Sequence, residues 1–302
     1  MATNLPTTRQ LSHFLSLVEH EHFGRAADSE FVSQSALSSS IKELEQRLGT
    51  QLVDRTNRQV TITATGQEVA TQARMVIRDL NSLVEIAAGE KAPLTGELRL
   101  GVIPTIAPFL LPKVLPKLRR KFPDLQLYLT EDRTDRIHER LMDGALDVLL
   151  LALPWELRGV ETYDLFNDPF RLACRKGTER VDPNQYRFNR LETDSILLLE
   201  DGHCLRDHAL AACKIRNTQK VQRFSASSLL TLIEMVDADL GITFLPAMAD
   251  GSALLRNTHV ELHEMGELSY RKIGLAWRRR SGRAEEFQLL GQYVREFSGD
   301  RA

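Results

Sequence analysis

The sequence predicts an α/β protein with a helical N-terminal region and a larger region in which strands and helices alternate. Within the first 65 residues, apolar residues recur at spacings of three and four, the period of an α-helix. From Glu97 on, short apolar segments of strand type alternate with helical ones. Residues 146–153 are almost continuously apolar, which is typical of a strand buried in a parallel sheet. Residues 89–96, with Gly89, Pro93 and Gly96, separate the two regions.

The composition is that of a soluble globular protein, since 42% of the 302 residues are hydrophobic and 26% are charged. No stretch reaches 18 apolar residues, and the N-terminus lacks the apolar segment of a secretory signal, so we expect a cytoplasmic protein without a membrane span. Three cysteines do not form a disulfide framework, and a disulfide in that compartment would be transient. Charge alone does not indicate DNA binding, because the net charge is −2 and residues 1–88 hold eight Lys and Arg against ten Asp and Glu.

After a first helix over residues 9–20, two helices joined by a tight turn are expected within residues 23–48. Ser33 is a good N-cap and Gly49 a good C-terminal stop for the second of them. Its polar face offers short side chains that fit a major groove, and arginines follow in a hairpin-like segment over residues 54–63. The expected DNA contacts are Ser33, Gln34, Ser35, Ser38, Lys42, Arg55 and Arg58. Periodicity alone fits an ordinary helical bundle with a polar face equally well.

A further helix is expected after residue 65. Thr65 and Glu68 have the spacing of a capping box. Apolar residues then follow in the narrow stripe of a heptad seam, which favours pairing of this helix between two chains. The seam residues are Val69, Ala73, Val76, Leu80, Leu83 and Ala87. The alternative is a single amphipathic helix packed on its own domain.

Cys204 and Cys213 lie nine residues apart in a segment that we expect to be a helix opening near Asp201. Cys204 would then lie in the first turn, where the helix dipole, His203 and Arg206 stabilise a thiolate. Nine residues of helix separate two Cα atoms by roughly 13–14 Å, whereas a disulfide needs less than about 7 Å. A disulfide between them therefore requires the helix to unwind. The alternative is two unrelated cysteines, and Cys174, in a strand-like run, is expected to be inert.

The N-terminal motifs resemble those of LysR-type transcriptional regulators over about 60 residues, with Ser35 where the family usually has proline. The motif residues are Arg25-Ala26-Ala27, Val32-Ser33-Gln34-Ser35-Ala36-Leu37-Ser38, Ile41-Lys42-Glu43-Leu44-Glu45, Leu48-Gly49, Leu52-Val53-Asp54-Arg55 and Thr63-Ala64-Thr65-Gly66. The resemblance implies a winged helix-turn-helix DNA-binding domain over residues 1–65 and a linker or dimerisation helix over 66–92. It also implies a two-lobed α/β regulatory domain, similar to periplasmic binding proteins, over 93–302. Lobe I would hold about 93–166 and 268–302, and lobe II about 167–267.

A narrower resemblance joins the chain to the peroxide-sensing OxyR branch of this family. It rests on Glu200-Asp201-Gly202-His203-Cys204-Leu205-Arg206-Asp207 with Cys213, on Glu19-His20-Glu21-His22-Phe23, on Arg25-Ala26-Ala27-Asp28-Ser29 and on Ile103-Pro104-Thr105. It implies that Cys204 is the peroxidatic and Cys213 the resolving cysteine. It also implies a peroxide site formed by Thr105, Thr134, His203, His208 and Arg278.

Two positions depart from that branch. His208 stands where glutamine is common, and Asp237 and Asp239 make the following run unusually acidic. Both departures concern the sensitivity to peroxide, and a histidine can add pH dependence near neutrality.

The sequence therefore predicts a peroxide-sensing transcriptional regulator that is not an enzyme and needs no cofactor or metal. Oxidation of Cys204, followed by a disulfide with Cys213, would refold the regulatory domain and change DNA binding and the transcription of oxidative-stress genes. The expected partners are palindromic double-stranded DNA, further copies of the chain in a dimer or tetramer, RNA polymerase, and hydrogen peroxide as the signal. The alternatives are a LysR-type regulator of a small metabolite, a thiol peroxidase and a periplasmic solute-binding protein.

Overall fold

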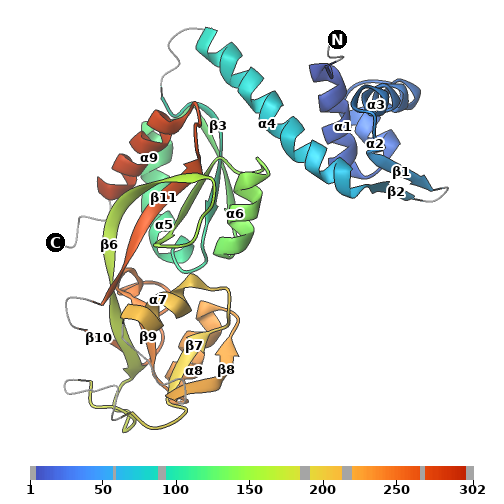
Figure 1. Cartoon of the computed structure of the whole chain (residues 1–302). Helices are drawn as coiled ribbons and strands as arrows, with labels where there is room; N and C mark the ends of the chain where they lie inside the picture. Colours follow the sequence, from blue (N-terminus) through green and yellow to red (C-terminus); the bar gives the residue numbers. More distant parts are fainter. Residues whose placement is uncertain are drawn as a thin grey trace. The chain divides into compact units, whose positions relative to one another are not determined.

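The computed structural model of the chain describes residues 5–56, 59–87, 93–183, 191–212, 220–265 and 269–296. The chain divides into two compact units (Figure 1). The first contains residues 1–92 together with Met142–Ala145, and the second contains Pro93–Leu141 and Leu146–Ala302. None of the described helices is long and apolar enough to cross a membrane.

Helices α1 (Thr8–His20), α2 (Phe23–Ser29) and α3 (Gln34–Leu48) form the core of the first unit. Each helix begins at a side-chain cap, because the first backbone N–H groups have no partner within the helix. Thr7 caps α1 in a capping box with Gln10, and Ser33 accepts a hydrogen bond from Ala36 N at 3.2 Å to cap α3. Gly49 ends α3 in the left-handed conformation, with φ 68°. The strands β1 (Val53–Thr56) and β2 (Gln59–Ile62) then form an antiparallel wing.

The turn between α2 and α3 contains a residue in an unusual conformation. Phe31 has φ 55°, in the left-handed region that a bulky side chain rarely adopts, and its side chain is 95% exposed. Helix α2 ends two residues before it, at Ser29. The turn places Ser33 at the start of α3.

Helix α4 (Ala64–Ala87) starts two residues earlier than a capping box at Thr65 predicts. Thr63, rather than Thr65, supplies the cap, because Thr63 Oγ1 accepts a hydrogen bond from Gly66 N at 3.0 Å. The expectation of a Thr65–Glu68 box is therefore wrong. The early part of the helix packs in the core of its own unit through Ala70 and Ala73. Further along, Val76, Leu83 and Val84 are exposed.

In the second unit, lobe I is built on a sheet with strand order β4-β3-β5-β11-β6. Strands β3 (Gly96–Val102), β4 (Leu125–Glu131) and β5 (Val148–Leu153) are parallel. β11 (Tyr270–Arg278) runs antiparallel to β5 and to β6 (Val160–Arg175). The helices of this lobe are α5 (Ala107–Lys121), α6 (Thr134–Met142) and α9 (Ala284–Glu296), and α9 packs on β6 and β11.

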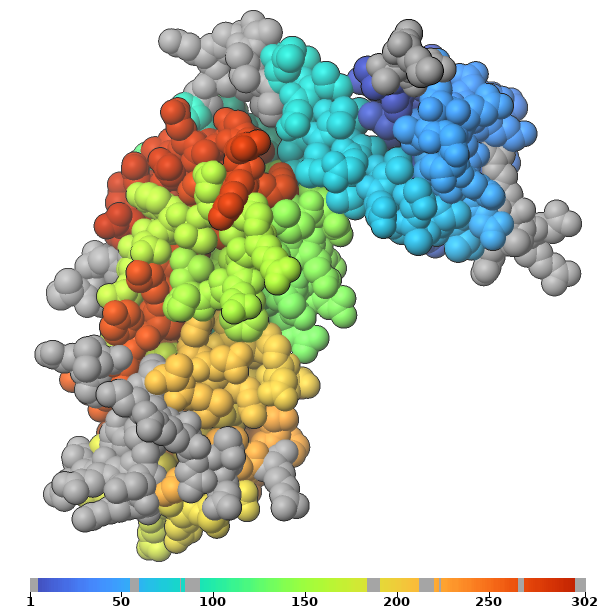
Figure 2. All heavy atoms as spheres, viewed as in Figure 1, coloured from blue at the N-terminus to red at the C-terminus, as the bar shows by residue number. Residues whose placement is uncertain are grey.

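Lobe II continues from the same long strand β6. Beyond Pro169, where its pairing with β11 ends, β6 pairs with β9 (Thr243–Pro246) and β10 (Val260–Glu264). The parallel strands β7 (Ile196–Leu199) and β8 (Val221–Ala226) join this sheet through a bridge between Ile196 and Ile242. Helices α7 (Cys204–Ala212) and α8 (Leu229–Asp237) and the 3-10 turn η3 (Ala247–Ala249) complete the lobe. In Figure 2 the green and red atoms of lobe I and the orange atoms of lobe II occupy opposite ends of the unit.

Candidate functional site

The strand order brings three sequence-predicted residues together. Thr105 follows β3, Thr134 opens α6 after β4, and Cys204 opens α7 after β7. The carboxyl ends of parallel strands are where α/β folds place their functional side chains. Thr105 and Thr134 are both 1% exposed, and both hydroxyls lie against the Cys204 thiol. Thr134 Oγ1 makes no hydrogen bond of ordinary geometry to a described group.

Cys204 is a free thiol that is only 2% exposed. Burial raises the pKa of this thiol above its ordinary value, and the charge of Arg271 and the Thr134 and Thr105 hydroxyls oppose that shift. Helix α7 begins at Cys204, three residues later than the expected start near Asp201, so Cys204 still lies at the helix start. Desolvation of the buried thiol outweighs the thiolate stabilisation expected there. The resting thiol is therefore mainly protonated at neutral pH.

Arg271 is the positively charged residue beside the thiol, and the sequence did not predict it. Its side chain is fully buried. The guanidinium donates from Nη1 to Thr105 Oγ1 and from Nη2 to the Thr105 carbonyl, both at 2.9 Å. The pattern gave only a weak signal, since Arg271 stands at the start of an apolar strand where a charged residue usually marks an exposed end.

Asp168 holds Arg271 from the other side. It is the cross-strand partner of Arg271 between β6 and β11, and Asp168 Oδ2 accepts a hydrogen bond from Arg271 Nε at 3.0 Å. Asp168 Oδ1 accepts a second one from Met248 N at 3.1 Å, which ties the pair to η3. Burial raises the pKa of Asp168, and Arg271 opposes the shift. The pair lies where β6 and β11 pass between the lobes.

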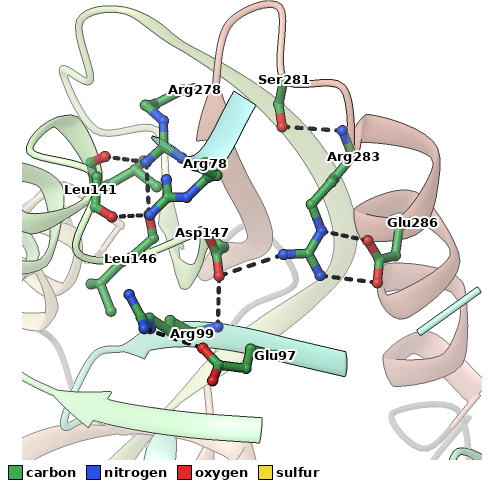
Figure 3. Close-up of polar contacts among 11 residues, drawn as sticks. Arg78, Glu97, Arg99, Leu141, Leu146, Asp147, Arg278, Ser281, Arg283 and Glu286 are labelled. Carbon is green, nitrogen blue, oxygen red and sulfur yellow. Dashed lines mark hydrogen bonds and ion pairs between the residues drawn. The ribbon is translucent and has the colours of Figure 1, made fainter. Parts of the chain in front are cut away.

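Arg278, the arginine expected at the peroxide site, lies at the opposite end of β11. It is seven residues from Arg271 along the strand, or roughly 23 Å at 3.3 Å per residue. Its guanidinium donates to the carbonyls of Leu141 and Leu146 (Figure 3). The expectation that Arg278 lies at a site with Thr105 and Thr134 is therefore wrong. Nearby in the same view, Arg283 pairs with Glu286 and Asp147.

His203 and Arg206, which were expected to stabilise the Cys204 thiolate, do not supply positive charge to it. His203 is buried, and burial followed by the charge of Arg133 lowers its pKa, so it is a neutral ring. Arg206 Nε contacts Asp201 Oδ1 at 2.9 Å, and its Nη1 donates to the Leu199 carbonyl at 3.2 Å. Both residues shape the start of α7. The positive field at the thiol comes from Arg271.

The other described residues that the sequence singled out in the regulatory domain make hydrogen bonds or are buried. His208 bonds the Pro154 carbonyl through Nε2 at 3.0 Å. Asp237 caps a loop by accepting from His259 N at 2.6 Å, and Asp239 accepts from Thr178 Oγ1 at 2.6 Å, so both acidic residues act locally within lobe II. Burial raises the pKa of Cys174 to about 11, which suits an inert thiol. Cys213 lies outside the described residues.

The polar residues predicted to contact DNA are on one side of α3. Gln34, Ser35 and Lys42 are exposed, and Ser38 is half-buried. The Ser33 hydroxyl caps the helix and is 3.0 Å from Ser35 Oγ, so the two serines form a small polar cluster at the helix start. The backbone of Arg55 pairs with Val60 in the wing, and Arg58 lies outside the described residues.

Comparison with known families accounts for this combination. Residues 8–67 match the bacterial regulatory helix-turn-helix protein model of the lysR family, and residues 91–299 match the LysR substrate binding domain. The chain is a LysR-family transcriptional regulator. The match confirms the family resemblance and the expected fold class, a winged helix-turn-helix followed by an α/β regulatory domain.

Among relatives of this LysR-family regulator, the HTH-type transcriptional regulator EstR of Acinetobacter baylyi is 40% identical over 287 residues, 95% of each chain. The DNA-binding transcriptional dual regulator OxyR of Escherichia coli is 38% identical over 287 residues, 95% of this chain and 94% of the relative. A solved full-length OxyR variant from Pseudomonas aeruginosa superposes with a TM-score of 0.81 at 31% identity, covering 96% of this chain and 94% of that one. The regulator thus has OxyR proteins among its close relatives, together with a regulator of another name.

Proposed function

We propose that this regulator senses hydrogen peroxide through Cys204 and passes the signal to DNA by a disulfide between Cys204 and Cys213. The observation that carries the proposal is the setting of Cys204. A buried thiol opens a helix against two threonine hydroxyls and an arginine that is itself held by a buried carboxylate. Hydroxyls can bond the peroxide oxygens, and a guanidinium favours the anions that form when the O–O bond breaks.

The chemistry takes place in two steps. The Cys204 thiolate attacks one peroxide oxygen, the O–O bond breaks, and the leaving hydroxide takes a proton to become water. Sulfur is oxidised by two electrons to a sulfenic acid while peroxide is reduced. The Cys213 thiol then attacks the sulfenic sulfur, forms the disulfide and releases a second water. We assign Thr105, Thr134 and Arg271 to the peroxide contact.

The proposed disulfide requires α7 to unwind. The helix runs from Cys204 to Ala212, the residue before Cys213. The Cα atoms of Cys204 and Ala212 are separated by eight helical rises, about 12 Å at 1.5 Å per residue, well beyond the roughly 7 Å Cα separation that a disulfide tolerates. Closing the bond therefore remodels a segment between the lobes, which is how a local oxidation can reach the DNA-binding unit.

We further propose that the regulator works in the cytoplasm as a dimer or tetramer on palindromic DNA and contacts RNA polymerase. The exposed Val76, Leu83 and Val84 on α4 support pairing of this helix with a second copy. A groove of about 490 Å³, which includes Leu5, Leu11, Leu48, Val69 and Val76 in its lining, lies at the packed part of the same helix. Two recognition helices in a dimer would read two half-sites.

Mass spectrometry of the full-length chain after brief peroxide treatment tests the proposal. We expect a loss of two hydrogens, assigned to a Cys204–Cys213 linkage, in the unmodified sequence. The variant Cys213→Ser should stop at a sulfenic acid on Cys204, and Cys174→Ser should behave as the unmodified chain. Unmodified Cys204 and Cys213 would reject peroxide sensing and favour the metabolite-responsive alternative.

A further inference from the structure

His208 makes a contact that the peroxide chemistry does not use. It lies on α7 four residues after Cys204, one helical turn further along. Its Nε2 is 3.0 Å from the carbonyl of Pro154, and its ring packs edge-on against Trp155 with ring centroids 6.5 Å apart. Since Pro154 and Trp155 follow β5 of lobe I, this contact fastens the cysteine-bearing helix of lobe II to lobe I.

The hydrogen bond fixes the tautomer of the ring. A carbonyl only accepts, so Nε2 carries the proton. Nδ1 is then a lone-pair acceptor, and it is buried without a partner among the described residues. Burial lowers the pKa of His208, opposed by the bond to Pro154, so the ring is neutral at neutral pH. A neutral imidazole with one hydrogen-bonded nitrogen and one aromatic contact is suited to holding α7 in place, since its proton is already donated to Pro154 and is not directed at the thiol.

The same segment has to move in the proposed reaction. If Cys204 and Cys213 join, the helix between them unwinds, and His208 leaves Pro154 and Trp155. The contact is therefore present before oxidation and lost after it. We propose that His208 is a positioning residue that holds α7 folded against lobe I and slows the unwinding that follows oxidation of Cys204. This inference rests on the proposed function for its kinetic consequence, but its structural part stands without it.

The structural part is tested on the reduced full-length chain, without peroxide, by hydrogen–deuterium exchange of the α7 amides. His208→Ala should raise their exchange rate roughly tenfold, as expected for the loss of a hydrogen bond and an aromatic contact. His208→Gln can donate to the Pro154 carbonyl without packing on Trp155, so it should recover part of the protection. His138→Ala is the matched control, because His138 on α6 also bonds a backbone carbonyl, that of Arg158, at 3.0 Å. Unchanged α7 exchange in His208→Ala would overturn the inference.

The kinetic part separates two steps after a peroxide pulse. In His208→Ala, trapping of the sulfenic acid should show an initial oxidation rate within about twofold of the unmodified chain. Disulfide formation should be several-fold faster, and His208→Gln should lie between the two. A loss of the first step alone would make His208 a peroxide contact and overturn the inference. If the unmodified chain forms no sulfenic acid, the proposed function fails, and the exchange experiment alone decides the role of His208.

Discussion

Arg271 on β11 and Asp168 on β6 form a buried ion pair where these two strands pass from lobe I to lobe II, with Arg271 Nε and Asp168 Oδ2 3.0 Å apart. Side-chain exposure is 0% for the arginine and 3% for the aspartate, so neither charge is solvated by water. Arg271 Nη1 and Nη2 donate to the hydroxyl and carbonyl of Thr105, and Nη2 also contacts Met248 Sδ. The other carboxylate oxygen of Asp168 accepts from Met248 N in η3. The pair therefore links Thr105, beside the Cys204 thiol, to η3 of lobe II.

Asp168→Asn should destabilise the regulatory unit strongly. Removing one partner of a buried pair leaves an uncompensated charge, which typically costs about 3–5 kcal/mol. Urea unfolding of the full-length chain should show an earlier transition of the regulatory unit. Lys272→Gln is the matched control on the same strand, since its pair with Asp164 is exposed and its loss should leave the transition in place. Equal shifts in both variants would contradict the role given to burial.

Oxidation of Cys204 should accelerate with pH. The thiolate is the nucleophile. Because burial raises the pKa of the Cys204 thiol, only a small fraction of the protein holds Cys204 as thiolate at neutral pH. The rate should rise about tenfold per pH unit until the thiol pKa is reached. Arg271→Gln removes the main opposing charge, so the rise should continue to higher pH and the rate at pH 7 should fall. Stopped-flow oxidation of the Cys213→Ser background measures both, and a flat profile would contradict the raised pKa.

The sequence predicted one half of this site and misplaced the other. Cys204 and Thr105 could be found because each lies in a short motif that carries the resemblance to the peroxide-sensing branch, namely residues 200–207 and 103–105. Arg271 could not, since its role depends on the register of β11 against β6, which brings it opposite Asp168. The resemblance implies Arg278 instead, but Arg278 lies seven residues further along the same strand, at its other end. Likewise, the effect of burial on the Cys204 pKa depends on packing between lobes, which no local pattern contains.

Gly202→Ala should weaken the start of α7. Gly202 has φ +93°, a conformation that alanine rarely adopts, and an added Cβ would lie 3.1 Å from Arg133 Nη1. Strain of this kind costs about 1–3 kcal/mol, so the regulatory unit should unfold at lower urea. Gly282→Ala is the control, because an added Cβ there meets no atom within 4 Å. A destabilisation by Gly282→Ala of the same size would show that loss of glycine, rather than strain, is responsible.

Phe31→Asn should stabilise the DNA-binding unit. The left-handed conformation at φ 55° costs a bulky residue about 1–2 kcal/mol, whereas asparagine tolerates it. Little packing is lost, because the ring is 95% exposed. Phe31→Ala separates the two effects, since alanine removes the ring but keeps most of the backbone strain. Thermal unfolding followed by circular dichroism should rank asparagine above alanine, and the reverse order would contradict a backbone origin.

Lys42 and Gln34 should affect DNA binding in different ways. Both are exposed on α3, but an ammonium group neutralises phosphates while a carboxamide reads base edges. The test duplex is one that the full-length chain selects from a random library. Lys42→Ala should weaken binding to all sequences alike, and the slope of log K against log salt concentration should become smaller by about one. Gln34→Ala should leave the salt slope unchanged and reduce the difference between the selected duplex and single-base variants. Lys113→Ala, an exposed lysine in the regulatory unit, is the charge control. The opposite result, a lower salt slope in Gln34→Ala and a weaker base preference in Lys42→Ala, would contradict the assignment of Lys42 to phosphates and of Gln34 to base edges.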